Sequence, residues 1–151
     1  MEPKLTWQSL LNSQRIKLHR VSPQELDDLR AVVERDLSDA GIEGLSTDRR
    51  FATAYNAVLQ LAKMVIACEG YRAAGFAHHQ TTLEALELAM GGAVSDLTAY
   101  FDTCRRKRNQ VDCDMADVAT EAELDDLMRK AHEFRALVEK WIRSNHPQHG
   151  L

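Results

Sequence analysis

The sequence predicts an all-α protein, built as an antiparallel up-and-down bundle of four to five helices. Helix-favouring Ala, Leu, Glu, Arg and Asp dominate the composition. Apolar residues recur at the spacing of a helix and do not alternate as they would in strands. The 151 residues include only three Pro and seven Gly, which limits the number of turns. A single domain of this length can bury a core without disulfides or metal.

The first part of the chain is predicted to hold a short helix and then a long one. We expect the short helix around residues 7–16, within an N-terminal extension that covers residues 1–21. Ser22 is placed to cap the long helix, a proline occupies its first helical position, and Glu25 closes a capping box. An apolar stripe at helical spacing then continues until Gly41 ends the helix.

The middle of the chain is predicted to form the longest helix and, after a connector, a short one. The longest helix runs from about residue 48 to residue 69, with Ser46 or Thr47 as its cap, and it carries one broad apolar face. The connector contains FAHHQ. It leads to Thr81 and Glu84, whose spacing predicts a capping box and the start of the short helix. The glycine pair at 91–92 ends that helix.

Two further helices complete the predicted bundle. The fifth helix starts near Ser95 and ends in a run of cations. Thr120 and Glu123 form a capping box for the last long helix. We therefore expect one helical bundle over residues 22–145, followed by a frayed tail at residues 146–151.

Charge and cysteine content limit the classes of partner and compartment. The net charge of -4 excludes a global basic field for nucleic acids or membranes, so any site for a polyanion must be local. Three cysteines (Cys68, Cys104 and Cys113) are an odd number without metal-binding spacing, which indicates reduced thiols. Neither a signal peptide nor an apolar run of transmembrane length is expected. The chain is therefore predicted to be cytoplasmic, with no membrane partner.

Arg108 occupies an unusual position on the predicted fifth helix. The inward stripe of that helix passes through Leu97, Phe101, Cys104 and Val111 at steps of three and four residues. Arg108 falls on the same stripe, between Cys104 and Val111. A cation on an apolar face costs free energy unless it is paired or reaches water. Arg108 therefore requires an anionic partner, either within the protein or from a ligand.

The identity of that anionic partner is left open by the sequence alone. Arg108 could pair with an acid on a neighbouring helix or with Asp112 one turn later, which would be a purely structural role. The adjacent cations Arg105, Arg106 and Lys107 turn increasingly away from the stripe. Such a run most often forms a solvated face.

Two segments of the chain resemble the HEPN superfamily, the higher eukaryote and prokaryote nucleotide-binding helical domains. They are AYNAVLQLAKMVIACEGYRAAGFAHHQTTLEAL and RRKRNQVDCD. The order of the helices, the long helix with Tyr55, the connector before TTLEAL and the late Arg-Asn pair all fit the family. The resemblance covers about residues 46–143.

The resemblance implies a site for RNA or a nucleotide. Active family members use an Arg, usually followed by a polar residue, with a His five positions after the Arg. These residues lie at a homodimer cleft and cleave RNA without metal. The matching positions here are Arg108, Asn109 and, in place of the His, Cys113. A thiol has an ordinary pKa near 8.5 and is a poor substitute for an imidazole, so the RNase motif is degenerate.

Other residues complete the predicted site. We place Arg105 and Lys107 at its rim and include Tyr55 among the ligand-binding candidates. His78 and His79 stand in the connector, where one of them could face the cleft or both could be surface imidazoles. No spacing of His and Cys supports a metal site, and no cofactor is predicted.

Three functional hypotheses follow. The first is a homodimeric HEPN-like module that binds RNA or a nucleotide without cleaving it, as a component of a toxin-antitoxin type of system. The second is an active metal-independent endoribonuclease toxin, with Cys113, His78 or His79 replacing the missing His. The third is a protein-interaction scaffold beside a nucleotidyltransferase, in which Arg108 forms an internal salt bridge. The dimer and the nucleotidyltransferase partner are implied by the resemblance alone.

Overall fold

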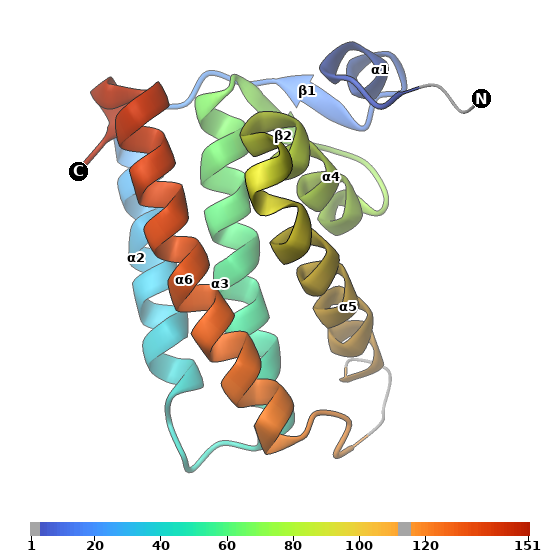
Figure 1. Cartoon of the computed structure of the whole chain (residues 1–151), viewed down its shortest axis with the longest axis vertical. Coiled ribbons are helices and arrows are strands. Elements are labelled where there is room, and N and C mark those ends of the chain that lie inside the picture. Colours follow the sequence, from blue (N-terminus) through green and yellow to red (C-terminus); the bar gives the residue numbers. More distant parts are fainter. Residues whose placement is uncertain (1–3, 112–115) are drawn as a thin grey trace.

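A computed structural model describes residues 4–111 and 116–151 and shows the expected helical bundle (Figure 1). The four long helices are α2 (Pro23–Ala40), α3 (Thr47–Cys68), α5 (Ser95–Val111) and α6 (Glu121–Asn145). The shorter elements are helices α1 (Trp7–Asn12) and α4 (His78–Met90), the 3-10 helices η1 (Gly91–Val94) and η2 (Pro147–His149), and the strands β1 (Ile16–Leu18) and β2 (Tyr71–Ala73). The prediction of an all-α bundle is confirmed.

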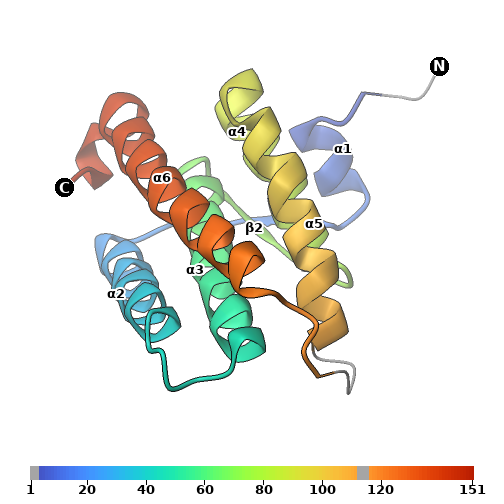
Figure 2. The same ribbon diagram turned by 60° about the horizontal axis from the view of Figure 1, so that its bottom comes forward.

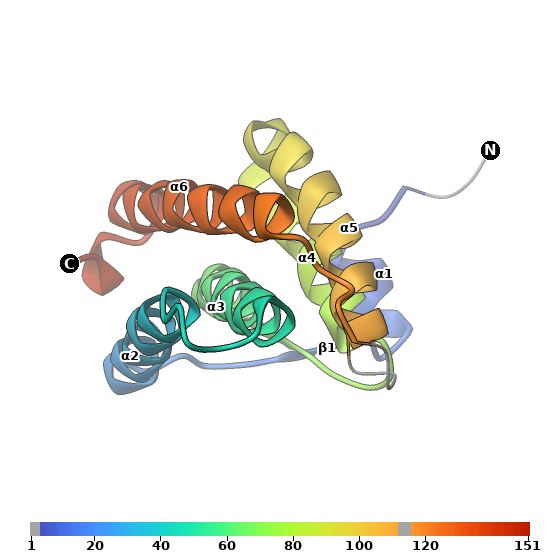
Figure 3. The same cartoon turned by 90° about the horizontal axis from the view of Figure 1, so that it is seen from below.

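Helix α3 is the centre of the bundle. It contacts α2, α4, α5 and α6, and these helices lie around it when the molecule is seen from below (Figure 3). Of the two predicted caps, Ser46 is the one used, because its hydroxyl accepts a hydrogen bond from the backbone N–H of Arg49 at 3.2 Å. Twelve of its residues are buried, which explains why its apolar face is so broad.

The same helix corrects the expectation that the chain holds no apolar run of transmembrane length. Within the described part of the chain, α3 is the one helix that is long and apolar enough to cross a membrane by length and composition alone. However, 67% of its most apolar stretch is buried inside the bundle. This burial is typical of the central helix of a helical core.

Of the capping boxes predicted for α2 and α6, the one at α6 is complete and the one at α2 is not. Thr120 and Glu123 form a complete box, in which each side chain accepts a hydrogen bond from the other residue's backbone N–H. Ser22 caps α2, but the box predicted with Glu25 is only half formed. The Glu25 carboxylate contacts the His19 ring instead, at 2.8 Å. Pairing with a nearby imidazole has replaced the return bond of the box.

The N-terminal segment differs from the helix predicted over residues 7–16. Helix α1 ends at Asn12, and a turn with a positive φ of 60° at Gln14 leads into β1. Strand β1 pairs antiparallel with β2, with Ile16 opposite Ala73. A strand of three residues is too short to show an alternating pattern in the sequence, so this ribbon was not predicted.

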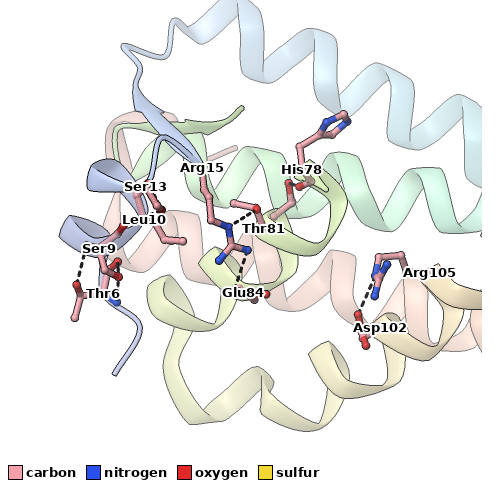
Figure 4. A network of polar contacts seen from close by, with 11 residues as sticks. Thr6, Ser9, Leu10, Ser13, Arg15, His78, Thr81, Glu84, Asp102 and Arg105 are labelled. Carbon is pink, nitrogen blue, oxygen red and sulfur yellow. Dashed lines mark hydrogen bonds and ion pairs between the residues drawn. The ribbon is translucent and has the colours of Figure 1, made fainter. Parts of the chain in front are cut away.

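Helix α4 begins four residues earlier than predicted, because its N-cap is Ala77 instead of Thr81. Thr81 is therefore fully buried inside the helix, where its hydroxyl accepts a hydrogen bond from Nε of Arg15 at 3.1 Å. The same guanidinium pairs with Glu84 at 3.0 Å (Figure 4). Thr81 and Glu84, whose spacing predicted a capping box, instead bind Arg15 and hold the N-terminal segment against α4.

The end of the chain also differs from the frayed tail that was expected. Residues 147–149 form η2, and the carbonyl of His149 accepts a hydrogen bond from Arg30 on α2 at 2.7 Å. His146 contacts Glu69 at the end of α3 at 2.8 Å. These contacts hold the tail against the bundle.

Candidate anion-binding pocket

The end of α5 and the start of α4 together form a surface pocket of about 240 Å³, which we call the arginine pocket. Among the described residues, its lining comprises three residues from α5, three from the first turn of α4 and the residue before it: Arg105, Arg108, Asn109, His78, His79, Gln80 and Ala77. Five of the residues predicted to bind a ligand are therefore brought together in space. They come from two segments that are about 25 residues apart in the sequence.

Helix α5 positions its cations through the side that it buries. Phe101 and Cys104 point into the core, which leaves Arg108 half-buried at the edge of the apolar stripe, as predicted. Arg105 was expected to turn away from this stripe, but its side chain is only 18% exposed and lines the pocket. Its Nε donates to Asp102, one turn earlier, at 2.9 Å (Figure 4). This bond orients the Arg105 guanidinium at the pocket wall.

The other two cations of the run do not line the arginine pocket. Arg106 is 69% exposed, as expected for a solvated face, and it shares the Asp102 carboxylate with Arg105. Lys107, predicted at the rim, lies instead against α6, where it pairs with Glu123 at 2.5 Å and donates to the carbonyl of Val118. Hydrogen bonding from Lys107 lowers the pKa of Glu123. Lys107 therefore ties α5 to α6.

The first turn of α4 supplies the opposite wall of the pocket. Ala77 occupies the N-cap position with a positive φ of 57°, and no side chain among the described residues caps the helix. The first backbone N–H groups of a helix lack carbonyl partners within it and carry a partial positive charge. Such an N-terminus, facing two arginines, is a favourable environment for a phosphate or carboxylate group.

His79 is kept neutral at physiological pH by this environment. Burial is the main cause that lowers its pKa to about 4, and the positive field of His78, Arg108, Lys63 and Arg105 lowers it further. Its ring lies over that of Tyr55, with centroids 6.1 Å apart. With this low pKa the neutral imidazole is a weak base, and it cannot act as a general acid near pH 7.

Lowering the pH is expected to destabilise the fold through His79. The ordinary pKa of histidine is 6.5 and that of His79 in the folded chain is about 4. Between pH 4 and 6.5, His79 is therefore protonated in the unfolded chain but neutral in the folded chain. Stability therefore rises with pH across this window and falls as the solution is acidified. Urea unfolding at several pH values in this window should show a weaker pH dependence for His79→Gln than for the wild type. The exposed His132→Gln serves as the control, and an equal pH dependence in all three proteins would contradict the assignment.

Tyr55, a predicted ligand-binding residue, lies behind the pocket and not in its lining. It is 1% exposed, and burial raises its pKa, although Arg105 and Arg108 oppose that shift. Its hydroxyl has no hydrogen-bond partner among the described residues. A buried hydroxyl of this kind contributes little to stability and carries a desolvation penalty.

Tyr55→Phe is therefore expected to leave the free energy of unfolding unchanged or to raise it by about 1 kcal/mol. Tyr71→Phe provides a comparison, because Tyr71 is only partly buried and stacks on Trp7. Urea unfolding of the three proteins gives the measurement. A loss of more than about 1 kcal/mol in Tyr55→Phe would mean that the hydroxyl is satisfied in solution by a partner such as an ordered water.

A comparison with protein families identifies the framework on which the pocket is built. Residues 43–139 match the family described as HEPN_SAV_6107-like HEPN. The chain belongs to the HEPN superfamily. The comparisons with curated proteins and with solved structures returned no match. The matched range of this HEPN chain contains α3, α4 and α5, and therefore every residue that lines the arginine pocket.

The thiols of this HEPN protein contribute nothing to the pocket within the described residues. Cys113, the predicted substitute for the motif His, lies outside those residues. Burial raises the pKa of both Cys68 and Cys104 to about 11, so these two remain protonated at neutral pH. Residues 4–111 and 116–151 also hold no cluster of three His, Cys, Asp or Glu side chains that could bind a metal.

Two residues of the pocket were missed by sequence reasoning. Gln80 and Ala77 line it because α4 starts at His78. The capping-box pattern at Thr81 indicated a later start and placed FAHHQ in an irregular connector. The sequence signal for the earlier start is Gly75, which directly precedes FAHHQ. Glycine favours positive φ angles, and Gly75 and Ala77 both adopt such angles just before the helix.

Proposed function

We propose that this HEPN bundle binds single-stranded RNA through the arginine pocket and does not cleave it. A phosphate group would accept hydrogen bonds from the guanidinium of Arg108, the amide of Asn109 and the first backbone N–H groups of α4. The observation that carries this proposal is the convergence of two arginines and an uncapped helix N-terminus on one pocket. Each of these features favours an anion, and none depends on the net charge of the chain.

The surroundings of the pocket favour an exposed, flexible strand as the ligand. The pocket is small and lies on the surface, so it can hold a phosphate group but not a whole nucleotide buried on all sides. Phe76, which precedes the pocket residue Ala77, is fully exposed. Exposed aromatic rings beside a basic groove stack the unpaired bases of single-stranded nucleic acids. A phosphate contact with an aromatic neighbour matches one nucleotide unit of such a strand.

We also propose that the protein acts as a homodimer, as the family resemblance implies. Two copies would present two arginine pockets and a longer basic track for the strand. Size-exclusion chromatography with light scattering measures this directly. A monomer at micromolar concentration that still binds RNA would overturn the dimer proposal and leave the RNA proposal standing.

Metal-independent RNA cleavage is the second candidate function, and the position of two imidazoles favours it. His78 and His79 lie in the same pocket as Arg108, with ring centroids 4.9 Å apart. An imidazole beside a phosphate-binding arginine could replace the motif His as a general base. The low pKa of His79 makes it a weak base, however, and for this reason binding without cleavage ranks first.

The deciding experiment measures binding and cleavage together in the presence of EDTA. End-labelled single-stranded RNA is titrated with protein by fluorescence anisotropy, and the same samples are run on a denaturing gel. The wild type is compared with Arg108→Gln and with Arg106→Gln. This is a matched control, because it removes the same charge from the same helix on its exposed side.

The outcomes distinguish RNA binding from RNA cleavage and from general charge attraction. Three results together would support the proposal. Arg108→Gln should bind RNA about tenfold or more weakly than the wild type, Arg106→Gln should bind it equally well, and the RNA should stay intact. Cleavage that requires Arg108 would favour the ribonuclease. Equal loss of binding in both variants would mean that only general charge attracts the RNA, and no binding by the wild type would overturn both functions.

A further inference from the structure

A second cavity, larger than the arginine pocket, lies between the N-terminal segment and the bundle. Its volume is about 390 Å³, within the range of roughly 300–1,000 Å³ that is usual for pockets holding small organic ligands. Its walls come from the connection between β1 and α2, from α2 itself, and from α3, β2 and α4. In Figure 2, α2 and β2 lie on opposite sides of α3, and the chain between β1 and α2 runs past α3 from one side to the other. The β1–α2 connection and α2 lie outside the family-matched range, so this cavity is not a feature of the matched family region alone.

The floor of the cavity is apolar. Ile66 and Ala67 from α3 are 1% and 4% exposed, and Leu29 from α2 packs against the main core of the bundle. Tyr71 from β2 forms a side wall, and its ring is held by stacking on Trp7 with centroids 4.6 Å apart. A floor of aliphatic and aromatic surface gains free energy by covering a hydrocarbon or aromatic body, because water is released from both surfaces.

The charges at the cavity are unbalanced and positive. Lys63 lies half-buried on α3 and Arg72 lies exposed on β2, and both line the cavity. No acidic side chain among the described residues forms an ion pair with either of them. Glu25, the one carboxylate among the described residues of the lining, already contacts His19 at 2.8 Å. An anionic group would therefore find two cations without having to displace an existing ion pair.

We infer that this cavity binds a small organic anion with an apolar or aromatic body, such as an aryl sulfonate or a carboxylate. The body lies on Ile66, Ala67 and Leu29, and the anionic group lies between Lys63 and Arg72. Among the described residues this cavity shares only His78 with the arginine pocket, and its test uses neither RNA nor a variant of His78.

The test uses two fluorescent probes that share one body and differ in charge. The first is 8-anilinonaphthalene-1-sulfonate, and the second is N-phenyl-1-naphthylamine, which lacks the sulfonate. Each probe is titrated into the full-length wild type, into the double variant Lys63→Gln/Arg72→Gln, and into Lys140→Gln. Lys140 is an exposed lysine on α6 and controls for the loss of charge. Phe76→Ala is added as a fourth protein, because the fully exposed Phe76 is another surface to which the probes could bind.

The expected result is saturable binding of one sulfonate probe per chain, weakened about tenfold or more in the double variant. Lys140→Gln and Phe76→Ala should bind it like the wild type. The neutral probe should bind the double variant and the wild type alike, which also shows that the cavity still exists in the variant. Equal sulfonate binding in the wild type and the double variant, or loss of binding in Phe76→Ala, would overturn the inference. Absence of saturable binding by the wild type would also overturn it.

Discussion

Replacing Phe101 with alanine is expected to lower the free energy of unfolding by about 3–5 kcal/mol. Phe101 is fully buried on α5, and its ring packs against that of Phe134 on α6 with centroids 5.2 Å apart. The substitution removes apolar surface from the core and leaves a cavity where these two helices meet. Because small domains have a total stability of only about 5–15 kcal/mol, this loss is a large fraction of the whole.

The matched control for this prediction is Phe76→Ala. Phe76 is fully exposed, so the same chemical change there should alter the free energy of unfolding by less than about 0.5 kcal/mol. Urea denaturation followed by circular dichroism gives both values. Equal effects of the two substitutions would show that α5 does not pack on α6 in solution as it does in this structure.

Removing both arginines of the arginine pocket is expected to weaken the binding of single-stranded RNA by at least about 100-fold. Hydrogen bonds to a charged group contribute about 1.5–3 kcal/mol each, and about 1.4 kcal/mol corresponds to a factor of ten in affinity. Arg105→Gln/Arg108→Gln removes two such donors and leaves the α4 N-terminus in place. Anisotropy titrations of labelled RNA measure the change.

The salt dependence of binding separates this specific loss from a general loss of charge. Each phosphate contact on a single strand contributes about 0.7 to the slope of log affinity against log salt, so the double variant should lose about 1.4. The control is Arg106→Gln/Lys140→Gln, which removes two exposed cations from other surfaces. A control that loses as much affinity as the double variant would contradict a contact at the arginine pocket.

Periodicity was sufficient to predict the long helices because each is amphipathic over several turns. The stripe through Leu97, Phe101 and Cys104 is buried as expected, and the Thr120 capping box is present. Periodicity could not predict the elements that depend on contacts between distant segments. Strands β1 and β2 are three residues each and exist only because they pair with one another across more than fifty residues of chain. No local pattern encodes such a pairing.

The start of α4 shows why a local motif can mislead. Thr81 and Glu84 have the spacing of a capping box, yet both are used by Arg15, which lies far away in the sequence. A tertiary contact has taken the polar groups that would otherwise cap the helix. The helix therefore extends back to His78.

The candidate site was predicted in part. Arg108 and Asn109 could be placed by the helical wheel and the family resemblance, and the structure brings them together with His78 and His79. Whether this group binds a ligand stays a prediction. Lys107 shows the limit of the wheel, since its angle on α5 could not reveal that Glu123 on α6 would pair with it. The role of Cys113 also stays a prediction, because it lies outside the described residues.

The contact of Arg15 with Thr81 and Glu84 has a consequence for how such proteins diverge. Arg15 lies outside the family-matched range, whereas the helix start that it holds lies inside that range and lines the arginine pocket. Relatives could therefore keep the Arg-Asn pair unchanged and still alter the second wall of their pocket by substituting residues in the N-terminal segment. Selection for a new ligand can therefore act on the N-terminal segment, which lies outside the family-matched range, while the helices of the bundle stay unchanged.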